Sequence, residues 1–186
     1  MRYFHEGRTL IELIPIVFLL CLLGGMALPA LSGWSARHAV LSASHLLHGH
    51  LHLARHQALV TGTSTVVCPL STDVCDGEAG DWGMGWIVFH DPDVHQQCTP
   101  DSAYEFCLEH GGRILAMQPA LASVSVVANR NVSRRVRFNP QGMSYGYTGR
   151  FAFCHPAATE RVLGLVVPQT GRIRTALPQE LLECDH

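Results

Sequence analysis

The stretch GRTLIELIPIVFLLCLLGGMALPAL, residues 7–31, places a glutamate directly before a long apolar run. From Leu13 to Leu31 the run has 19 residues without a charged side chain, and the next charge after Glu12 is Arg37. As a helix it would extend about 28 Å, close to the roughly 30 Å of a bilayer's hydrocarbon core. We predict a transmembrane anchor over 13–31, since a removed signal peptide has a shorter apolar region and a small-residue cleavage site. A carboxylate in hydrocarbon costs about 2.5–3.5 kcal/mol, so Glu12 implies a partner of opposite charge. The alternative is that Glu12 lies solvated at the membrane interface, where the N-terminus of a helix favours an acid.

A second apolar pattern follows the anchor and is typical of an amphipathic helix. It recurs at steps of three and four residues in Val40, Ser44, Leu47, Leu51, Ala54 and Ala58. We expect one long helix over residues 8–61, with the anchor at 13–31 and a second half at 36–61. Gly24, Gly25 and Pro29 are expected to interrupt it, and Pro15 to remove one backbone hydrogen bond.

Beyond Gly62 the sequence changes to short β-rich runs separated by turn signals such as Asn139-Pro140-Gln141-Gly142. We predict eight strands, at 64–68, 86–90, 113–117, 123–128, 135–138, 150–154, 161–167 and 172–175. The predicted fold class is therefore α+β, in which an antiparallel, two-sheet β-rich domain over residues 62–186 packs on the helix.

The cysteine pattern favours export into an oxidising compartment. Cys21 lies inside the predicted anchor, and six cysteines follow it, at Cys68, Cys75, Cys98, Cys107, Cys154 and Cys184. An even set is most simply a disulfide framework, for which 15 pairings exist. We favour the sequential pairs Cys68–Cys75, Cys98–Cys107 and Cys154–Cys184. The spacings differ from those of C-x-x-C zinc pairs, so no metal site is predicted.

Charge is distributed unevenly along a chain whose formal net charge is only -2. Residues 38–110 carry nine acidic residues against Arg55, whereas residues 111–174 carry nine arginines against Glu160, a balance of +8. Acidic residues return in the tail with Glu180, Glu183 and Asp185. The split predicts a basic surface on the C-terminal half that is suited to a polyanion.

The segment from Gly7 through Thr9-Leu10-Ile11-Glu12-Leu13 resembles the cleavage site of type IV pilins and type II secretion pseudopilins. The resemblance implies that a prepilin peptidase removes residues 1–7 and methylates the new N-terminus at Arg8. It also implies that Glu12 pairs with the N-terminal amine of a neighbouring pilin in a filament. The chain would then be anchored in the bacterial inner membrane, with its C-terminal domain in the periplasm.

Later segments resemble the GspH/FimT-type minor pilins in particular: CPLSTDVCDGEAGDWGMGWIVFHDPD at 68–93, RVRFNPQGM at 135–143 and GRIR at 171–174. In FimT-type relatives a Gly-Arg-x-Arg motif is associated with DNA binding in natural transformation. The resemblance thus implies nonspecific double-stranded DNA binding through Gly171, Arg172 and Arg174. On a strand both guanidinium groups would share one face while Ile173 points to the core. The arginines expected to extend this patch are Arg134, Arg135, Arg137, Arg150 and Arg161. The alternative is a GspH-like structural pseudopilin that acts in protein secretion without binding DNA.

The histidines, the tryptophans and a search for enzyme motifs give no second candidate site beside the arginine motif. His45, His48, His52 and His56 would share one side of the helix. They could hold Zn²⁺ through His48 and His52, sense acid pH, or simply border the domain, and we favour the last. Trp82 and Trp86 either stack on bases or pack in the core, and we favour the core. No nucleophile elbow, phosphate loop or metalloprotease helix occurs, so the sequence predicts neither enzyme activity nor a cofactor.

Overall fold

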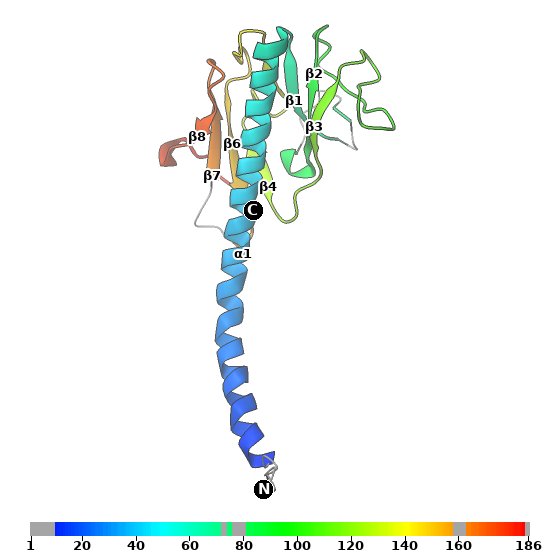
Figure 1. The fold of residues 1–186 in the computed structure, drawn as a ribbon. Coiled ribbons are helices and arrows are strands. Elements are labelled where there is room, and N and C mark those ends of the chain that lie inside the picture. The colour runs from blue at the N-terminus through cyan, green and yellow to red at the C-terminus, as the bar shows by residue number, and fades with distance from the viewer. Residues whose placement is uncertain (1–9, 72–73, 76–80, 158–162, 185–186) are drawn as a thin grey trace, which may run out of the picture.

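The computed structural model describes residues 10–71, 74–75, 81–157 and 163–184, although it leaves the side chains of residues 10–12 and 23–32 undescribed. Helix α1, Leu10–Thr61, has 52 residues and extends far beyond the globular domain (Figure 1). The predicted interruption at Gly24, Gly25 and Pro29 is wrong, since the helix runs unbroken through them. A proline removes a single backbone hydrogen bond, and the bonds of the flanking turns maintain the helix.

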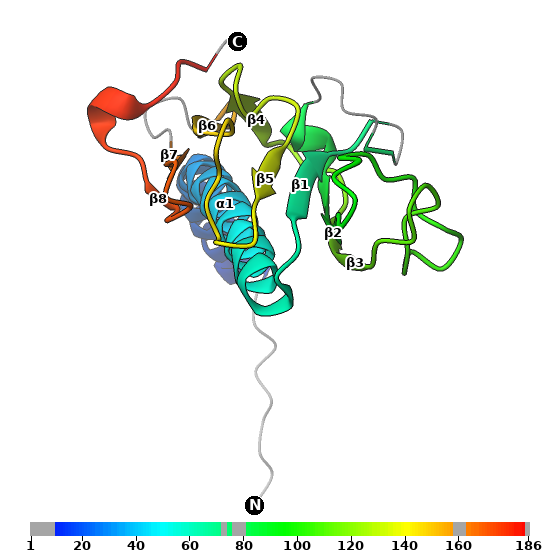
Figure 2. The ribbon, with the colours of Figure 1, turned by 90° about the horizontal axis from the view of Figure 1, so that it is seen from above.

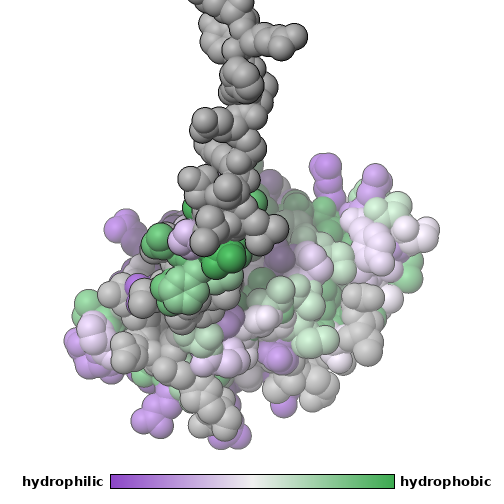
Figure 3. Space-filling view, turned by 90° about the horizontal axis from the view of Figure 1, so that it is seen from below, coloured by the Kyte–Doolittle hydropathy of each residue, from purple (hydrophilic) through white to green (hydrophobic). Residues whose placement is uncertain are grey.

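The predicted anchor falls on the protruding half of α1. Among the residues whose side chains the structure describes, no helical segment is both long and apolar enough to cross a membrane. The side chains of residues 23–32, which include the second half of the predicted anchor, lie outside that set. Viewed from the N-terminal side, hydrophobic residues gather where the helix enters the domain, and hydrophilic residues lie toward the rim (Figure 3).

Two four-stranded antiparallel sheets form the domain and make an arc over one side of α1 (Figure 2). The first sheet has the order β3-β2-β1-β5, with β3 Ile114–Gln118, β2 Trp86–His90, β1 Thr65–Pro69 and β5 Val136–Phe138. The second has the order β4-β6-β7-β8, with β4 Ser125–Ala128, β6 Gly149–Cys154, β7 Leu163–Val167 and β8 Arg174–Thr175. The predicted helix, eight strands and α+β class are confirmed, with strand ends displaced by one or two residues.

The main core lies between α1 and the two sheets. The predicted helical stripe is buried: Leu47, Leu51, Ala54 and Ala58 are 0% exposed, Val40 is 2% exposed and Ser44 is 5% exposed. Ser44 satisfies its hydroxyl by donating to the carbonyl of Leu41 at 2.9 Å. The apolar residues of this stripe belong to one cluster with Phe138, Phe151 and Phe153 from the sheets. Packing against both sheets therefore fixes the domain end of the helix.

The two tryptophans considered for base stacking are core residues, so that alternative is wrong. Trp82 and Trp86 are fully buried. The Trp82 indole donates to the carbonyl of Val132 at 3.1 Å and contacts Phe151 edge to face. The short helix η1, Trp82–Met84, which directly precedes β2 of the first sheet, thus packs against the second sheet.

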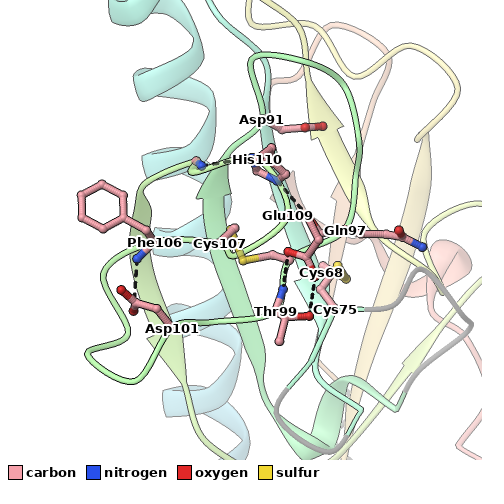
Figure 4. Close-up of a disulfide and its surroundings, with 12 residues drawn as sticks. Cys68, Cys75, Asp91, Gln97, Thr99, Asp101, Phe106, Cys107, Glu109 and His110 are labelled. Atoms are coloured by element: carbon pink, nitrogen blue, oxygen red, sulfur yellow. Dashed lines mark hydrogen bonds between the residues drawn. A yellow bond between two sulfur atoms is a disulfide. The ribbon is translucent and has the colours of Figure 1, made fainter.

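A second, smaller core covers the outer face of the first sheet. Val66, Cys68, Ile87 and Phe89 of the sheet pack there with three further cysteines of the two long loops. Figure 4 shows how carboxylates fix one of these loops. The Glu109 carboxylate accepts from the Thr99 N–H at 2.8 Å, and Asp101 accepts from the N–H of Glu105 at 2.8 Å. Acidic residues of the N-terminal half thus serve as loop anchors.

Candidate nucleic-acid interface

A row of side chains crosses the second sheet on the face directed away from α1. The strand register aligns Arg150 of β6 with Val166 of β7 and Val166 with Arg174 of β8. Their neighbours Phe151 and Leu165 face the helix as members of the main core. Because side chains alternate along a strand and neighbouring strands lie about 4.8 Å apart, Arg150 and Arg174 share the outer face about 10 Å apart.

Gly171 positions the motif at the end of this row. Its φ is +70°, and a Cβ atom there would lie 2.0 Å from the carbonyl oxygen of Gly142. The same carbonyl accepts from Nε of Arg55 on α1 at 3.0 Å, and the Gly171 N–H donates to Pro168 at 2.8 Å. Only a glycine fits this left-handed turn against another backbone.

The side chains after Gly171 alternate as predicted. Ile173 is 7% exposed and belongs to the main core, while Arg172 and Arg174 are exposed on either side of it. The predicted strand is two residues too long, because β8 begins at Arg174. Its partner β7 ends at Val167, and the tight turn from Pro168 to Gly171 follows at once. The two guanidinium groups are therefore presented by the end of a turn and a two-residue edge strand.

Arg174 is paired with an acidic residue that the sequence analysis assigned only to the tail. Its two terminal nitrogens donate to Glu180 Oε2 at 2.7 Å and Oε1 at 2.6 Å, with the side chains 46% and 25% exposed. The Leu177 N–H donates to the same carboxylate at 2.9 Å, and Arg150 donates to the Glu180 main-chain carbonyl at 3.1 Å. The hydrogen bonds from Arg174 and then Leu177 lower the pKa of Glu180 to about 2, so it is ionised at physiological pH.

Residues 176–184 form a segment that we name the C-terminal strap, which lies along the outer face of the second sheet. The Ala176 N–H donates to Gly164 of β7 at 2.8 Å, and the Leu181 side chain occupies the space that a Cβ of Gly164 would need. At its far end, Cys184 forms a disulfide with Cys154 of β6. The strap thus carries Glu180 back over the arginine row.

Of the other arginines predicted to extend the patch, two of the described ones, Arg135 and Arg137, make their contacts elsewhere. Arg137 is on β5 in the first sheet, with its guanidinium 5.8 Å from the ring centroid of Tyr147. Arg135 donates to the carbonyl of Gln96, whose side chain accepts from the Tyr147 hydroxyl. Arg134 is exposed, and Arg161 lies outside the described residues. Of the five predicted supporting residues, Arg150 is the one that the strand register places beside Arg174.

The three sequential disulfides predicted from the sequence are the ones that form: Cys68–Cys75, Cys98–Cys107 and Cys154–Cys184. Cys21 is free and exposed on α1. Gly7 and Arg8 lie outside the described residues, and Glu12 belongs to the first turn of α1, with a side chain that is not described.

The helix histidines form no metal site in the described part of the chain, where no group of three metal-ligating side chains occurs. His45, His52 and His56 are exposed, and His48 lies with its ring centroid 4.5 Å from that of His52. The sequence analysis missed His50, whose Nδ1 accepts from the buried Trp86 indole at 2.8 Å. The sequence could have indicated this contact, because His50 directly precedes Leu51 of the predicted buried stripe.

The burial of His50 leads us to predict that the free energy of unfolding falls in acid. Burial lowers the pKa of His50, and burial is also the main cause of the lowered pKa of His52 and His90. As the pH falls, the histidines are protonated in the unfolded chain before they are protonated in the folded one. Their contribution to the free energy of unfolding is therefore complete above about pH 6.5 and is lost as the pH falls through the lowered folded-state pKa. Urea unfolding at pH 7.5 and 5.5 should show this loss, and His50→Gln should reduce it. The control is the exposed His45→Gln. An unchanged pH dependence in His50→Gln would contradict the assignment.

The family model of the type II transport protein GspH matches residues 43–171, more than half of the chain. This chain belongs to the GspH family. As a GspH/FimT-type minor pilin it also shares its fold with a solved structure, the type IV minor pilin FimU of Pseudomonas aeruginosa PAO1. One crystal form gives a TM-score of 0.55 at 19% identity, covering 77% of this chain and 92% of FimU. A second crystal form gives 0.52 at 19% identity, covering 74% and 92%.

Comparison with curated protein sequences gives no significant match. The GspH match extends from the middle of α1 to the Gly171 turn. Arg172, Arg174 and the C-terminal strap follow directly after it, so the family match covers the scaffold of the arginine row but not its last strand.

Proposed function

We propose that this GspH-family minor pilin binds double-stranded DNA nonspecifically through Arg172 and Arg174, in the service of DNA uptake. The observation that carries the proposal is the exposure of both arginines on either side of the buried Ile173. A planar guanidinium can donate two parallel hydrogen bonds to a phosphate, which makes arginine well suited to this contact. Ile173 fixes the backbone in the core, so both side chains are held at one edge of the second sheet.

Three positive charges from the motif and Arg150 face one negative charge from Glu180. No described side chain pairs with Arg172, which is therefore available to a phosphate. Within the described part of the globular domain the one α-helix is the domain half of α1, which is packed against the sheets and cannot enter a DNA groove. We therefore expect contacts to phosphate without base readout, and weak binding that is sensitive to salt.

We propose further that the chain works within a filament of pilins anchored in the inner membrane. Cleavage after Gly7 by a prepilin peptidase would expose the amine of Arg8, four residues before Glu12 in the sequence. That amine in one subunit would neutralise the Glu12 carboxylate of its neighbour, since an intramembrane acid needs a partner. The protruding half of α1 supplies the contact surface along the filament axis (Figure 1).

The second candidate is a structural pseudopilin of a type II secretion filament, without a ligand of its own. The specific observation in its favour is the pairing of Arg174 with Glu180, because a paired guanidinium is less available to a phosphate. Of the two motif arginines, Arg172 alone then has no partner among the described residues. The family match ends at Gly171 and supports both candidates equally.

A gel shift with full-length protein in detergent tests the proposal. Wild type should bind a random duplex at low salt, and Arg172→Ala plus Arg174→Ala should abolish most of that binding. The control is Arg113→Ala plus Arg130→Ala, which removes two exposed arginines that belong to none of the eight strands and not to the motif. The control should retain wild-type affinity. Equal loss in both double variants would show a general charge effect and contradict a specific role for the motif.

A further inference from the structure

We propose that Glu180 of the C-terminal strap is an internal competitor for DNA, because it occupies the donors of Arg174 that a phosphate needs. This inference rests on the proposed DNA-binding function. It assigns to the strap a role in setting the affinity of the arginine row.

The contact between Glu180 and Arg174 has the geometry of anion recognition. Two guanidinium nitrogens meet two carboxylate oxygens at 2.7 and 2.6 Å, the fork arrangement that arginine uses for carboxylate and phosphate alike. A phosphate therefore cannot take the same two donors while Glu180 holds them. The carboxylate also places one negative charge directly at the edge where DNA would approach.

The surrounding residues hold this competitor in place. The Leu177 N–H binds the carboxylate, and the helix η2, Pro178–Glu180, sets the turn that returns Glu180 toward β8. Arg150 binds the Glu180 main-chain carbonyl, so both arginines of the row contact the same residue. Glu180 is thus held through its carboxylate by Arg174 and Leu177 and through its main-chain carbonyl by Arg150.

The strap is fastened on both sides of Glu180. Upstream, Ala176 donates to Gly164 of β7, and downstream Cys184 is bonded to Cys154 of β6. A tethered group competes at a high effective concentration because its binding is intramolecular. The Glu180 side chain can leave Arg174 by rotating about its own torsions, so DNA can displace it without any break in the disulfide.

The decisive comparison is Glu180→Gln against Glu183→Gln, in full-length protein titrated with a random DNA duplex. Both variants remove one negative charge from the same strap, but Glu183 is exposed and takes no part in the ion pair with Arg174. We expect Glu180→Gln to bind several-fold more tightly than wild type. Its plot of log affinity against log salt should be steeper by about 0.9, the equivalent of one additional phosphate. Glu183→Gln should match wild type.

The outcomes separate this inference from the function on which it rests. If wild type depends on Arg172 and Arg174 but Glu180→Gln behaves as wild type, the DNA-binding function stands and the competitor is overturned. Equal tightening by both Gln variants would also overturn it, since net charge would then be sufficient. If wild type and the Arg172→Ala, Arg174→Ala variant bind alike, the function itself fails. Thermal unfolding confirms that each variant is folded, and Glu180→Asp provides a second test, because its shorter carboxylate should also release Arg174.

Discussion

Replacing Gly171 with alanine is expected to lower the free energy of unfolding by about 2–5 kcal/mol. The left-handed conformation costs a non-glycine residue about 1–2 kcal/mol, and overpacking costs a further 1–3 kcal/mol. Both apply here, because φ is +70° and a Cβ would lie 2.0 Å from the Gly142 carbonyl oxygen. The backbone must shift to relieve that contact, which would also displace the Arg55 hydrogen bond to the same oxygen. Urea unfolding measures the change.

Gly146→Ala is the matched control for Gly171→Ala. Gly146 has a similar φ of +79°, but a Cβ there would meet no atom within 4 Å. Gly146→Ala should therefore lose only the conformational part of the free energy of unfolding, about 1–2 kcal/mol. Equal losses in the two variants would show that the close approach to Gly142 does not determine the need for glycine at the motif.

The second large effect is expected from Glu12→Ala, which should leave the chain in the membrane fraction and remove it from filaments. An unpaired carboxylate in hydrocarbon costs about 2.5–3.5 kcal/mol, which corresponds to roughly a hundredfold in an equilibrium constant. The alanine variant loses the attraction that fixes one subunit against the amine of the next. Immunoblotting of sheared filaments against the membrane fraction measures the ratio.

Glu12→Asp retains the carboxylate and serves as the control for that experiment. It should be incorporated into filaments at a level well above that of Glu12→Ala. Incorporation of the alanine variant at the wild-type level would contradict charge pairing as the basis of assembly.

Local patterns in the sequence were enough to predict the architecture. The spacing of Val40, Leu47 and Leu51 identifies the buried face of α1, because a helix repeats every 3.6 residues. The alternation around Ile173 likewise predicts which side chains of the motif are exposed. Such patterns depend only on the period of a single element, so they can be read before the tertiary structure is known.

Contacts between elements were beyond reach of the same patterns. The pairing of Arg174 with Glu180 depends on the turn around Pro178, and no helical or strand period relates the two residues. The separation of Arg137 from Arg150 depends on which strand joins which sheet. The hydrogen bond between His50 and Trp86 depends on the packing of α1 against β2. The continuity of α1 through Pro29 was mispredicted because local propensity was given too much weight.

The central claim is that Arg172 and Arg174 bind DNA phosphates, and the most direct test is the salt dependence of binding by the full-length protein. We predict that log affinity falls linearly with log salt. The slope for wild type should exceed that for Arg172→Ala plus Arg174→Ala by about 0.9, for the one phosphate that Arg172 binds while Glu180 holds Arg174. Identical slopes and affinities for the two proteins would contradict the claim.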